Sequence, residues 1–425
     1  MAKERIITAL DIGTTKICCI IAKMDDNDKL KIVGVGENKS DGLAKGMIKN
    51  IRAASESTDL AIKKAEEKAN VYAENIYVGV AGELIRSFVS SGMANIVSES
   101  KYTNEVNEYE VTDYEIEKVK EDAIKNTTIA QNRKIIHIEP QFYKVDKVEE
   151  VVDPIGMTGN RLEAQVHIVT ADLGNLNSIY KSLQRIGMDV RDVVLQPIAS
   201  ALAVLNDDEK ELGAILVDIG GGTTDISIYY KNSIRFSSII PFGGENITKD
   251  LSVGLRTPLQ EAEKIKLDYG YAIPEYADEN LEIEIPGIGG HPSTKRHQRF
   301  IAEIINPRIS EIINLVKKEV DKSKYLKLTT AGISVSGGAA NLRSTNQLIE
   351  KIFDGIPTKT GYPSFDNIYG DTEMLSNPKY ATAVGLLKWG KKYFDKNPLA
   401  TKGKQTYMQR LTQRIKNWFE NTSFT

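Results

Sequence analysis

A short pattern of aspartate, glycine and paired threonines occurs twice in this chain. The first copy, DIGTT, covers residues 11–15, and the second, DIGGGTT, covers residues 218–224. Each copy lies between two short apolar runs rich in β-branched residues, which predicts two strands joined by the motif. The two aspartates are 207 residues apart in a chain of 425. A strand–loop–strand unit repeated at about half the chain length predicts two related domains whose loops face each other.

Each loop has the chemistry of a phosphate-binding site. The glycines allow positive φ and the close approach of a ligand, and successive backbone N–H groups can form an anion-binding nest. The threonines add hydroxyl donors, and an aspartate at the strand end can hold hydrated magnesium. No helix follows directly and no Gly-Lys-Ser/Thr ending is present, which excludes the dinucleotide fingerprint and the P-loop. For one loop alone a tight turn is the simpler interpretation, but the repeat favours a polyphosphate clamp.

Composition and charge narrow the function classes. A net charge of −3 gives no basic field that would favour nucleic acid as a partner. Cys18 and Cys19 are adjacent and are the only cysteines, so we expect no disulfide, and a reducing compartment fits. No window reaches about eighteen consecutive apolar residues, so we expect no spanning helix. The four histidines have no zinc-site spacing.

Further motifs follow in the order of the actin–Hsp70–sugar kinase ATPase family, which the chain resembles. "DIGTTK" resembles its first phosphate loop and "DIGGGTTD" its second. "RDVVLQPIASALAVL" and "NPKYATAVGLL" resemble its two connecting helices, the latter with Ala383 and Gly385 allowing close packing. "EAEKIKLDYG" and "ISVSGGAANLRS" resemble its adenosine-binding segments. The resemblance implies an α/β fold of two duplicated ribonuclease-H-like domains, with ATP and Mg²⁺ between them.

The resemblance also implies roles for individual residues. Asp11 and Asp218 would order magnesium through water, and Gln196 would orient an attacking water, with Asp218 as the second catalytic residue. The phosphates would be held by Gly13, Thr14, Thr15, Gly220, Gly221, Gly222, Thr223 and Thr224. Lys16 would also reach a phosphate, with a side chain that points along the strand as the alternative. The adenosine would be held by Glu263, Lys266, Gly337 and Gly338. Because an amide is a poor general base, we expect at most weak ATPase activity.

The segment between the two motifs indicates the branch of this family. "DPIGMTGNRLE", residues 153–163, is similar to a segment of the bacterial cell-division FtsA family, and that resemblance covers residues 1 to about 395. It implies a small α/β subdomain inserted at residues 83–163. The two actin-like domains would then comprise residues 1–82, 164–195 and 355–395, and residues 196–244 and 304–354, with 245–303 as the outer subdomain of the second.

The FtsA resemblance implies a function in septum formation. A member would polymerise into actin-like protofilaments through its inserted subdomain. It would tether filaments of the tubulin-like protein FtsZ to the cytoplasmic face of the cell membrane, beside other division proteins. The partly acidic tail of FtsZ would dock on the outer subdomain, where Lys295 and Arg299 are candidate contacts. For these two residues a solvated basic loop is the alternative.

The end of the chain has an amphipathic pattern of its own. Residues 396–404 are a polar linker, and residues 405–425 predict a helix with one apolar stripe, aromatic residues and a cationic surround. That combination suits an anionic bilayer surface. The membrane-facing candidates are Met408, Arg410, Leu411, Arg414, Ile415, Trp418 and Phe419. A helix that packs on its own domain is the alternative.

Other functions of the same fold remain open on the residues alone. A sugar or acetate kinase would need a substrate-recognition cluster near Asp225, and none is evident in the sequence. An Hsp70-like chaperone would need a peptide-binding domain where only about thirty residues follow the ATPase segments. A pilus-assembly or cell-shape relative of actin is disfavoured by the inserted segment.

We predict that a chain ending at Lys404 loses binding to membranes. The full chain should pellet with anionic liposomes, since its tail buries apolar side chains and each basic residue near an anionic surface contributes on the order of 1 kcal/mol. Sedimentation of both chains, with and without ATP, tests this. If both stay in the supernatant, the tail is a structural helix and the membrane prediction is wrong.

Overall fold

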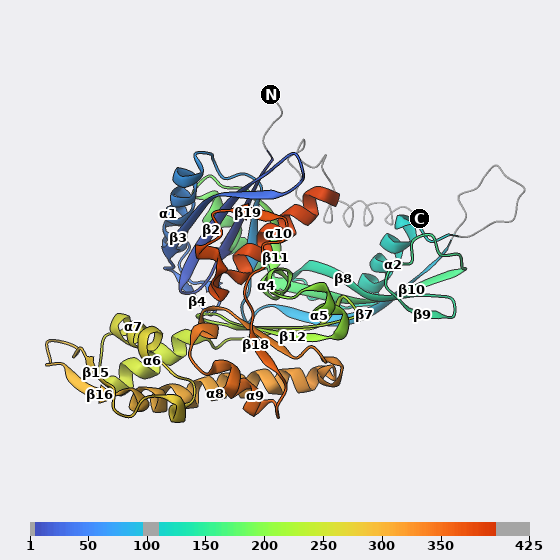
Figure 1. Ribbon diagram of the computed structural model, residues 1–425. Helices are drawn as coiled ribbons and strands as arrows, with labels where there is room; N and C mark the ends of the chain where they lie inside the picture. Colours follow the sequence, from blue (N-terminus) through green and yellow to red (C-terminus); the bar gives the residue numbers. More distant parts are fainter. Residues whose placement is uncertain (1–4, 97–109, 397–425) are drawn as a thin grey trace, which may run out of the picture.

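Two sheets of matching connectivity form the centre of the molecule (Figure 1). The structure, a computed structural model, describes residues 5–96 and 110–396. The sheets have the strand orders β11-β6-β1-β2-β3-β19 and β18-β17-β12-β13-β14. Each holds an antiparallel meander, β1–β2–β3 or β12–β13–β14, whose first strand also pairs in parallel with a later strand, β6 or β17. The predicted duplication and the actin-like fold are therefore confirmed.

The elements have the following bounds. The first sheet contains β11 (Val190–Leu195), β6 (Ile76–Val80), β1 (Ile6–Ile12), β2 (Lys16–Met24), β3 (Leu30–Lys39) and β19 (Ile368–Gly370). The second contains β18 (Thr358–Thr360), β17 (Ile333–Ser336), β12 (Ala214–Ile219), β13 (Thr224–Tyr230) and β14 (Ser233–Ile240). The helices beside them are α1 (Ile51–Ala69), α3 (Leu173–Gln184), α4 (Gln196–Val204), α5 (Asp207–Leu212), α8 (Gln298–Ser323), α9 (Thr345–Ile352) and α10 (Ala381–Lys396).

The strands of the first sheet are apolar along their length because helices cover both faces. Every residue of β1 is buried. Gly34 and Gly36 of β3 lie under α1, where an added Cβ would meet backbone oxygens of that helix at 2.2 and 2.0 Å. On the opposite face, Gly390 of α10 packs against Ile7 and Tyr77. Strands buried on both faces read as continuous hydrophobic runs, which is the pattern in this sequence.

Helices α4 and α10 cross between the two sheets and join them. One hydrophobic core runs from Ile6 of β1 through both helices to Leu216 of β12. The two helices approach so closely that a Cβ on Gly385 would lie 1.7 Å from the carbonyl oxygen of Ala199. The close packing predicted for Gly385 is therefore confirmed, and this contact sets how the two sheets face each other.

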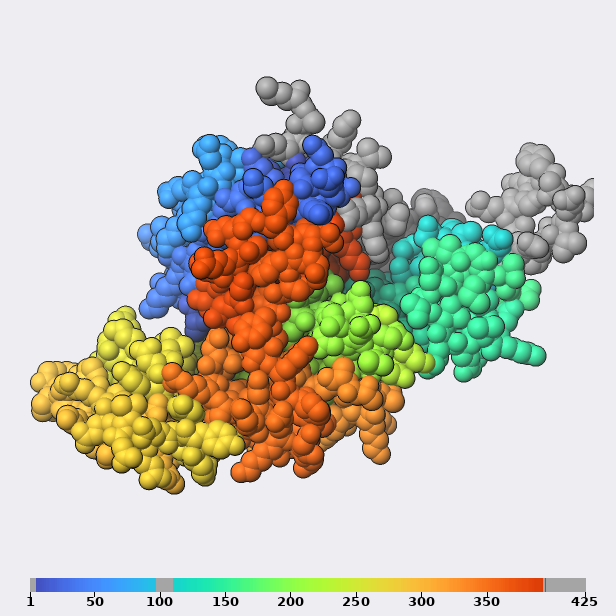
Figure 2. All heavy atoms as spheres, viewed as in Figure 1, coloured from blue at the N-terminus to red at the C-terminus, as the bar shows by residue number. Residues whose placement is uncertain are grey.

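A separate four-stranded sheet projects to one side of the molecule (Figures 1 and 2). It has the order β7-β10-β8-β9 and carries α2 on one face. Its elements are β7 (Arg86–Asn95), α2 (Asp113–Lys125), β8 (Arg133–Val145), β9 (Val148–Val151) and β10 (Arg161–Asp172). Helix α2 begins with a capping box between Thr112 and Glu115. The predicted end of the insertion at residue 163 falls inside β10, which continues to Asp172 as part of this sheet.

The inserted sheet is attached to both central sheets by buried polar contacts. Gln141 of β8 donates from Nε2 to the carbonyl oxygens of Ile234 and Arg235 in β14, at 2.8 and 2.9 Å. His137 of β8 accepts the backbone N–H of Leu195 in β11 at 2.9 Å. These bonds connect the insertion to the first domain and to the second domain at the same time.

A small outer lobe lies at the other end of the molecule, as the yellow and light orange parts of Figure 2 show. It contains α6 (Gly244–Leu255), α7 (Leu259–Tyr269) and the hairpin of β15 (Glu282–Ile285) and β16 (Thr294–His297), packed on the start of α8. No helix within residues 5–96 and 110–396 is long and apolar enough to cross a membrane. The predicted amphipathic helix at residues 405–425 lies outside the described residues.

We predict that Gly385→Ala destabilises the fold by about 2–4 kcal/mol, because the new methyl group overpacks a helix crossing that has no free space. Urea unfolding followed by circular dichroism measures this. Gly338→Ala is the matched control for stability, since a Cβ there meets no atom within 4 Å. Equal midpoints for the two variants would show that the crossing can relax.

Candidate functional site

The two repeated loops meet face to face across the gap between the domains. A Cβ built on Gly221 would lie 2.3 Å from the side chain of Thr15, and one on Gly222 would lie 2.4 Å from the hydroxyl of Thr14. The sequence indicated that Gly220, Gly221 and Gly222 allow positive φ and the close approach of a ligand, but none of the three has positive φ. Positions 221 and 222 require glycine because the side chains of Thr15 and Thr14 in the opposite loop leave no room for a Cβ atom.

The second loop is fixed in place by the start of helix α6. Backbone N–H groups of Gly244 and Glu245 donate to the carbonyl oxygens of Gly220 and Gly221, at 2.9 and 2.8 Å. No described residue accepts a hydrogen bond from the backbone N–H of Thr14, Thr15, Gly221 or Gly222. The carbonyl groups of the second loop are thus hydrogen-bonded, while backbone N–H groups of both loops have no acceptor among the described residues. A group of such N–H donors is the arrangement that binds phosphate.

Three buried carboxylates stand behind these loops. Asp218 and Asp225 are direct partners in the β12–β13 pair, and Asp11 is the last residue but one of the equivalent strand β1. Burial raises the pKa of Asp225 well above its ordinary value, and the charges of Asp218 and Asp11 raise it further. Burial also raises the pKa of Asp218 and of Asp11. One oxygen of Asp225, Oδ1, is buried without a hydrogen-bond partner in the described part of the chain.

This acidic cluster fits a hydrated cation better than a directly chelated one. Within residues 5–96 and 110–396, no group of three or more His, Cys, Asp or Glu side chains has the geometry to hold a metal ion. A magnesium ion keeps several of its waters and takes other ligands from phosphates. The unpaired oxygen of Asp225 and the carboxylates of Asp11 and Asp218 could accept hydrogen bonds from the waters of such an ion.

Lys16 and Gln196 converge on Asp11. The Lys16 ammonium lies 3.5 Å from Oδ2 of Asp11, and Gln196 donates from Nε2 to Oδ1 at 3.1 Å. Burial lowers the pKa of Lys16, but the charges of Asp11 and Glu37 outweigh it, so the net shift is upward. The side chain predicted to reach a phosphate is therefore a firmly charged ammonium beside the first loop.

The four predicted adenosine residues divide between two neighbouring elements. Lys266 donates to Gly244 O at 3.1 Å and pairs with Glu263 at 2.7 Å, and both contact Thr248. Gly337 has φ +85, and a Cβ there would lie 2.5 Å from Asp218, so the strand end requires glycine. One small pocket brings the two elements together and is lined by Gly244, Ile247, Lys266, Leu267, Gly338, Ala339, Asn341 and Leu342.

Sequence reasoning did not identify several residues that build this site. Ser200 of α4 donates to Asp218 at 2.7 Å and contacts the hydroxyl of Thr382 in α10 at 2.9 Å. The turn of a small hairpin, β4 (Leu43–Ala44) and β5 (Met47–Ile48), bonds through Gly46 N to the hydroxyl of Thr14 at 3.1 Å. The sequence signal for the hairpin was the turn pair Lys45-Gly46, both of which have positive φ.

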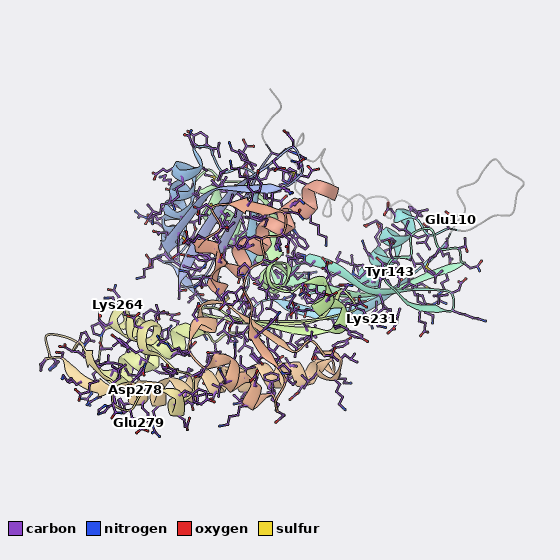
Figure 3. All side chains as sticks on the ribbon, viewed as in Figure 1. Glu110, Tyr143, Lys231, Lys264, Asp278 and Glu279 are labelled. Carbon is purple, nitrogen blue, oxygen red and sulfur yellow. The ribbon has the colours of Figure 1, made fainter. Side chains whose placement is uncertain are left out.

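The two candidate partner-binding cations lie far from this cleft, in the outer lobe. Lys295 of β16 is 3.1 Å from Glu282, and Arg299 of α8 pairs with Glu279 and, at 3.5 Å, with Glu303. Figure 3 labels Glu279 at the opposite end of the molecule from Tyr143 in the inserted sheet. Each candidate cation is thus partly neutralised by acids of its own lobe. The membrane-facing candidates between Met408 and Phe419 lie outside the described residues.

Comparison with known proteins gives consistent matches along the chain. The family model "Cell division protein FtsA" matches residues 215–385, and "SHS2 domain inserted in FTSA" matches residues 82–170. The chain is 36% identical to the cell division protein FtsA of Pseudomonas aeruginosa over 98% of each chain, and 38% identical to that of Neisseria meningitidis over 99% of each. Identity to the Escherichia coli protein is 30%, over 98% of this chain and 96% of that one.

Solved structures with the same architecture have much lower identity. The PilM-PilN type IV pilus biogenesis complex matches with a TM-score of 0.63 and 15% identity, covering 91% of this chain and 98% of that one. MreB5 of Spiroplasma citri bound to ADP matches with a TM-score of 0.52 and 17% identity, covering 94% and 99%. These likenesses establish the fold and nothing further.

We predict that Asp225→Asn stabilises the nucleotide-free protein at pH 7 by about 1–3 kcal/mol, since it removes a buried, incompletely paired carboxylate. A carboxyl group whose pKa is higher in the folded state than in the unfolded state lowers the free energy of unfolding at pH values above its folded-state pKa. At pH values below its unfolded-state pKa it has no such effect. The gain should therefore shrink as the pH falls from 7 towards 4.

Urea unfolding at a series of pH values measures this difference. The exposed Asp371→Asn is the matched control and should show no gain at any pH. A loss of stability in Asp225→Asn at pH 7 would show that the carboxylate is fully satisfied in the free protein.

Proposed function

The chain belongs to the FtsA family of bacterial cell-division proteins, and on that premise we propose that it binds ATP in the cleft between its two domains and tethers FtsZ filaments to the cell membrane. Its role lies in cell division. The observation that best supports nucleotide binding is the pair of facing loops, whose backbone amides have no acceptor among the described residues and which are flanked by three buried carboxylates. Such a site is complementary to a polyphosphate with its cation.

Each part of the cleft has an assigned role in this proposal. The amides and hydroxyls of Thr14 and Thr15, with those of residues 220–224, would bind the phosphates, and Lys16 would add one positive charge. Asp11 and Asp218 would accept hydrogen bonds from waters around Mg²⁺, which when bound neutralises phosphate charge. Gln196 would position the attacking water. Since its amide cannot take a proton, turnover would be slow.

ATP would then act mainly as a clamp. A ligand that contacts both loops favours the closed arrangement of the domains by its differential affinity for that state. The closed state would favour head-to-tail polymerisation, with the inserted subdomain making the longitudinal contact. The bonds of Gln141 and His137 to both central sheets support this, because they connect the insertion to both walls of the cleft.

Membrane attachment and FtsZ binding would use different segments of the chain. The amphipathic segment 405–425 would lie in the membrane surface and make the protein peripheral, on the cytoplasmic face at the septum. The acidic tail of FtsZ would displace intramolecular acids from Lys295 and Arg299 in the outer lobe. Membership of the FtsA family leaves the kinase alternative without a supporting observation.

We predict that Arg299→Glu reduces recruitment of FtsZ to vesicles by about tenfold, because reversing one charge in an electrostatic contact adds repulsion to lost attraction. The assay sediments FtsZ filaments with phosphatidylglycerol-containing liposomes, the full chain and Mg·ATP. Lys322→Glu is the matched control, since Lys322 lies on the same helix and pairs with Glu319 at 2.5 Å. Equal recruitment by both variants would remove Arg299 from the interface, and no recruitment by the wild-type chain would overturn the tether.

A further inference from the structure

A buried tyrosine lies between the two halves of the proposed nucleotide site. Tyr380 is 2% exposed and ends the short 3-10 turn η5 (Pro378–Tyr380) that leads into α10. The ammonium groups of Lys16 and Lys379 each lie 4.7 Å from the centre of its ring. Its hydroxyl donates to Oε2 of Glu37 on β3 at 2.6 Å. One aromatic side chain thus connects three charged residues.

The ring gives Lys16 a partner that does not use up its hydrogen-bond donors. An aromatic face attracts a cation electrostatically but leaves the ammonium N–H groups free in direction. Lys16 is 3.5 Å from Oδ2 of Asp11, the far limit of a hydrogen bond, so the ammonium is held between carboxylate and ring rather than closed onto the carboxylate. A lysine held in this way can still donate to a phosphate.

The same turn is bonded to the loop proposed to bind the adenosine. Pro378 accepts from Gly337 N at 3.2 Å, and the side chain of Asn377 accepts from Nδ2 of Asn341 at 3.0 Å. Asn341 lines the small pocket beside Gly338. The residues from 377 to 380 therefore contact the base-binding loop at one end and Lys16 at the other.

We propose that Tyr380, oriented by Glu37, is a positioning residue that holds the Lys16 ammonium for the outer phosphates and so sets the preference for ATP and ADP over AMP. The inference rests on the proposed nucleotide site. It adds that the number of phosphates on the nucleotide is recognised through Tyr380, which does not itself contact a phosphate. A purely structural Tyr380 would instead affect all nucleotides equally, because it would act only through the fold.

Binding of AMP, ADP and ATP to the full chain, measured by calorimetry with Mg²⁺, separates these roles. Tyr380→Leu should weaken ATP binding about tenfold and AMP binding less than about twofold, the size of one lost cation–π contact and its positioning effect. In a Lys16→Met background the same substitution should have no further effect on ATP, because the two residues act as one unit. Tyr380→Phe keeps the ring and should retain most of the affinity.

Equal weakening of all three nucleotides by Tyr380→Leu, or full additivity with Lys16→Met, would overturn the proposal. A second measurement requires no nucleotide. In protein reductively methylated with ¹³C, the Lys16 methyl signal, assigned by its loss in Lys16→Arg, should be displaced by the ring current of Tyr380. The displacement should persist in Tyr380→Phe and vanish in Tyr380→Leu. If the Lys16 signal of the wild-type chain is not displaced, the proposed positioning of Lys16 by Tyr380 is wrong. If the signal is displaced but the chain does not bind ATP, only the proposed nucleotide site is overturned.

Discussion

The close crossing of α4 and α10 is the contact on which the rest of the structure depends. Gly385 lets the backbone of one helix touch the carbonyl of Ala199 on the other, and a single hydrophobic core extends through the crossing into both sheets. The same two helices carry Ser200, which donates to the carboxylate of Asp218, and Thr382, whose hydroxyl contacts that of Ser200. The packing that joins the domains therefore also sets the distance between the two loops. The site and the core depend on the same contact between helices.

Several charged side chains are buried beside the two loops. Burial raises the pKa of Asp11, Asp218 and Asp225, and the charges of the other two carboxylates raise that of Asp225 further. Lys16 lies between Asp11 and the Tyr380 ring. Buried like charges are unfavourable in a free protein, and strongly perturbed carboxylates in a cleft are typical of functional sites. A bound cation with its phosphates would relieve this repulsion, so ligand binding and domain closure would share the same free energy.

The inserted subdomain takes part in this arrangement although none of the cleft residues named above belongs to it. Its strand β8 bonds to β14 through Gln141 and to β11 through His137. Those two strands belong to different sheets, so a change in their relative position must be absorbed at the insertion. Burial lowers the pKa of His137 to about 3, so the ring stays neutral and keeps accepting the backbone N–H of Leu195 at ordinary pH.

Local pattern was enough to predict the duplication, the two hairpins and the loop residues, because strand periodicity and glycine clusters are properties of short segments. It was not enough to explain the glycines at positions 221 and 222, which do not have positive φ but face Thr15 and Thr14 of the other domain. Nor did it reveal Tyr380 beside Lys16, or the extent of β10 past residue 163. The glycine–threonine and Tyr380–Lys16 contacts join residues more than two hundred positions apart, and the end of β10 pairs with other strands of the insertion. All of these contacts follow from strand register and from how the domains pack, which no short segment of a sequence encodes.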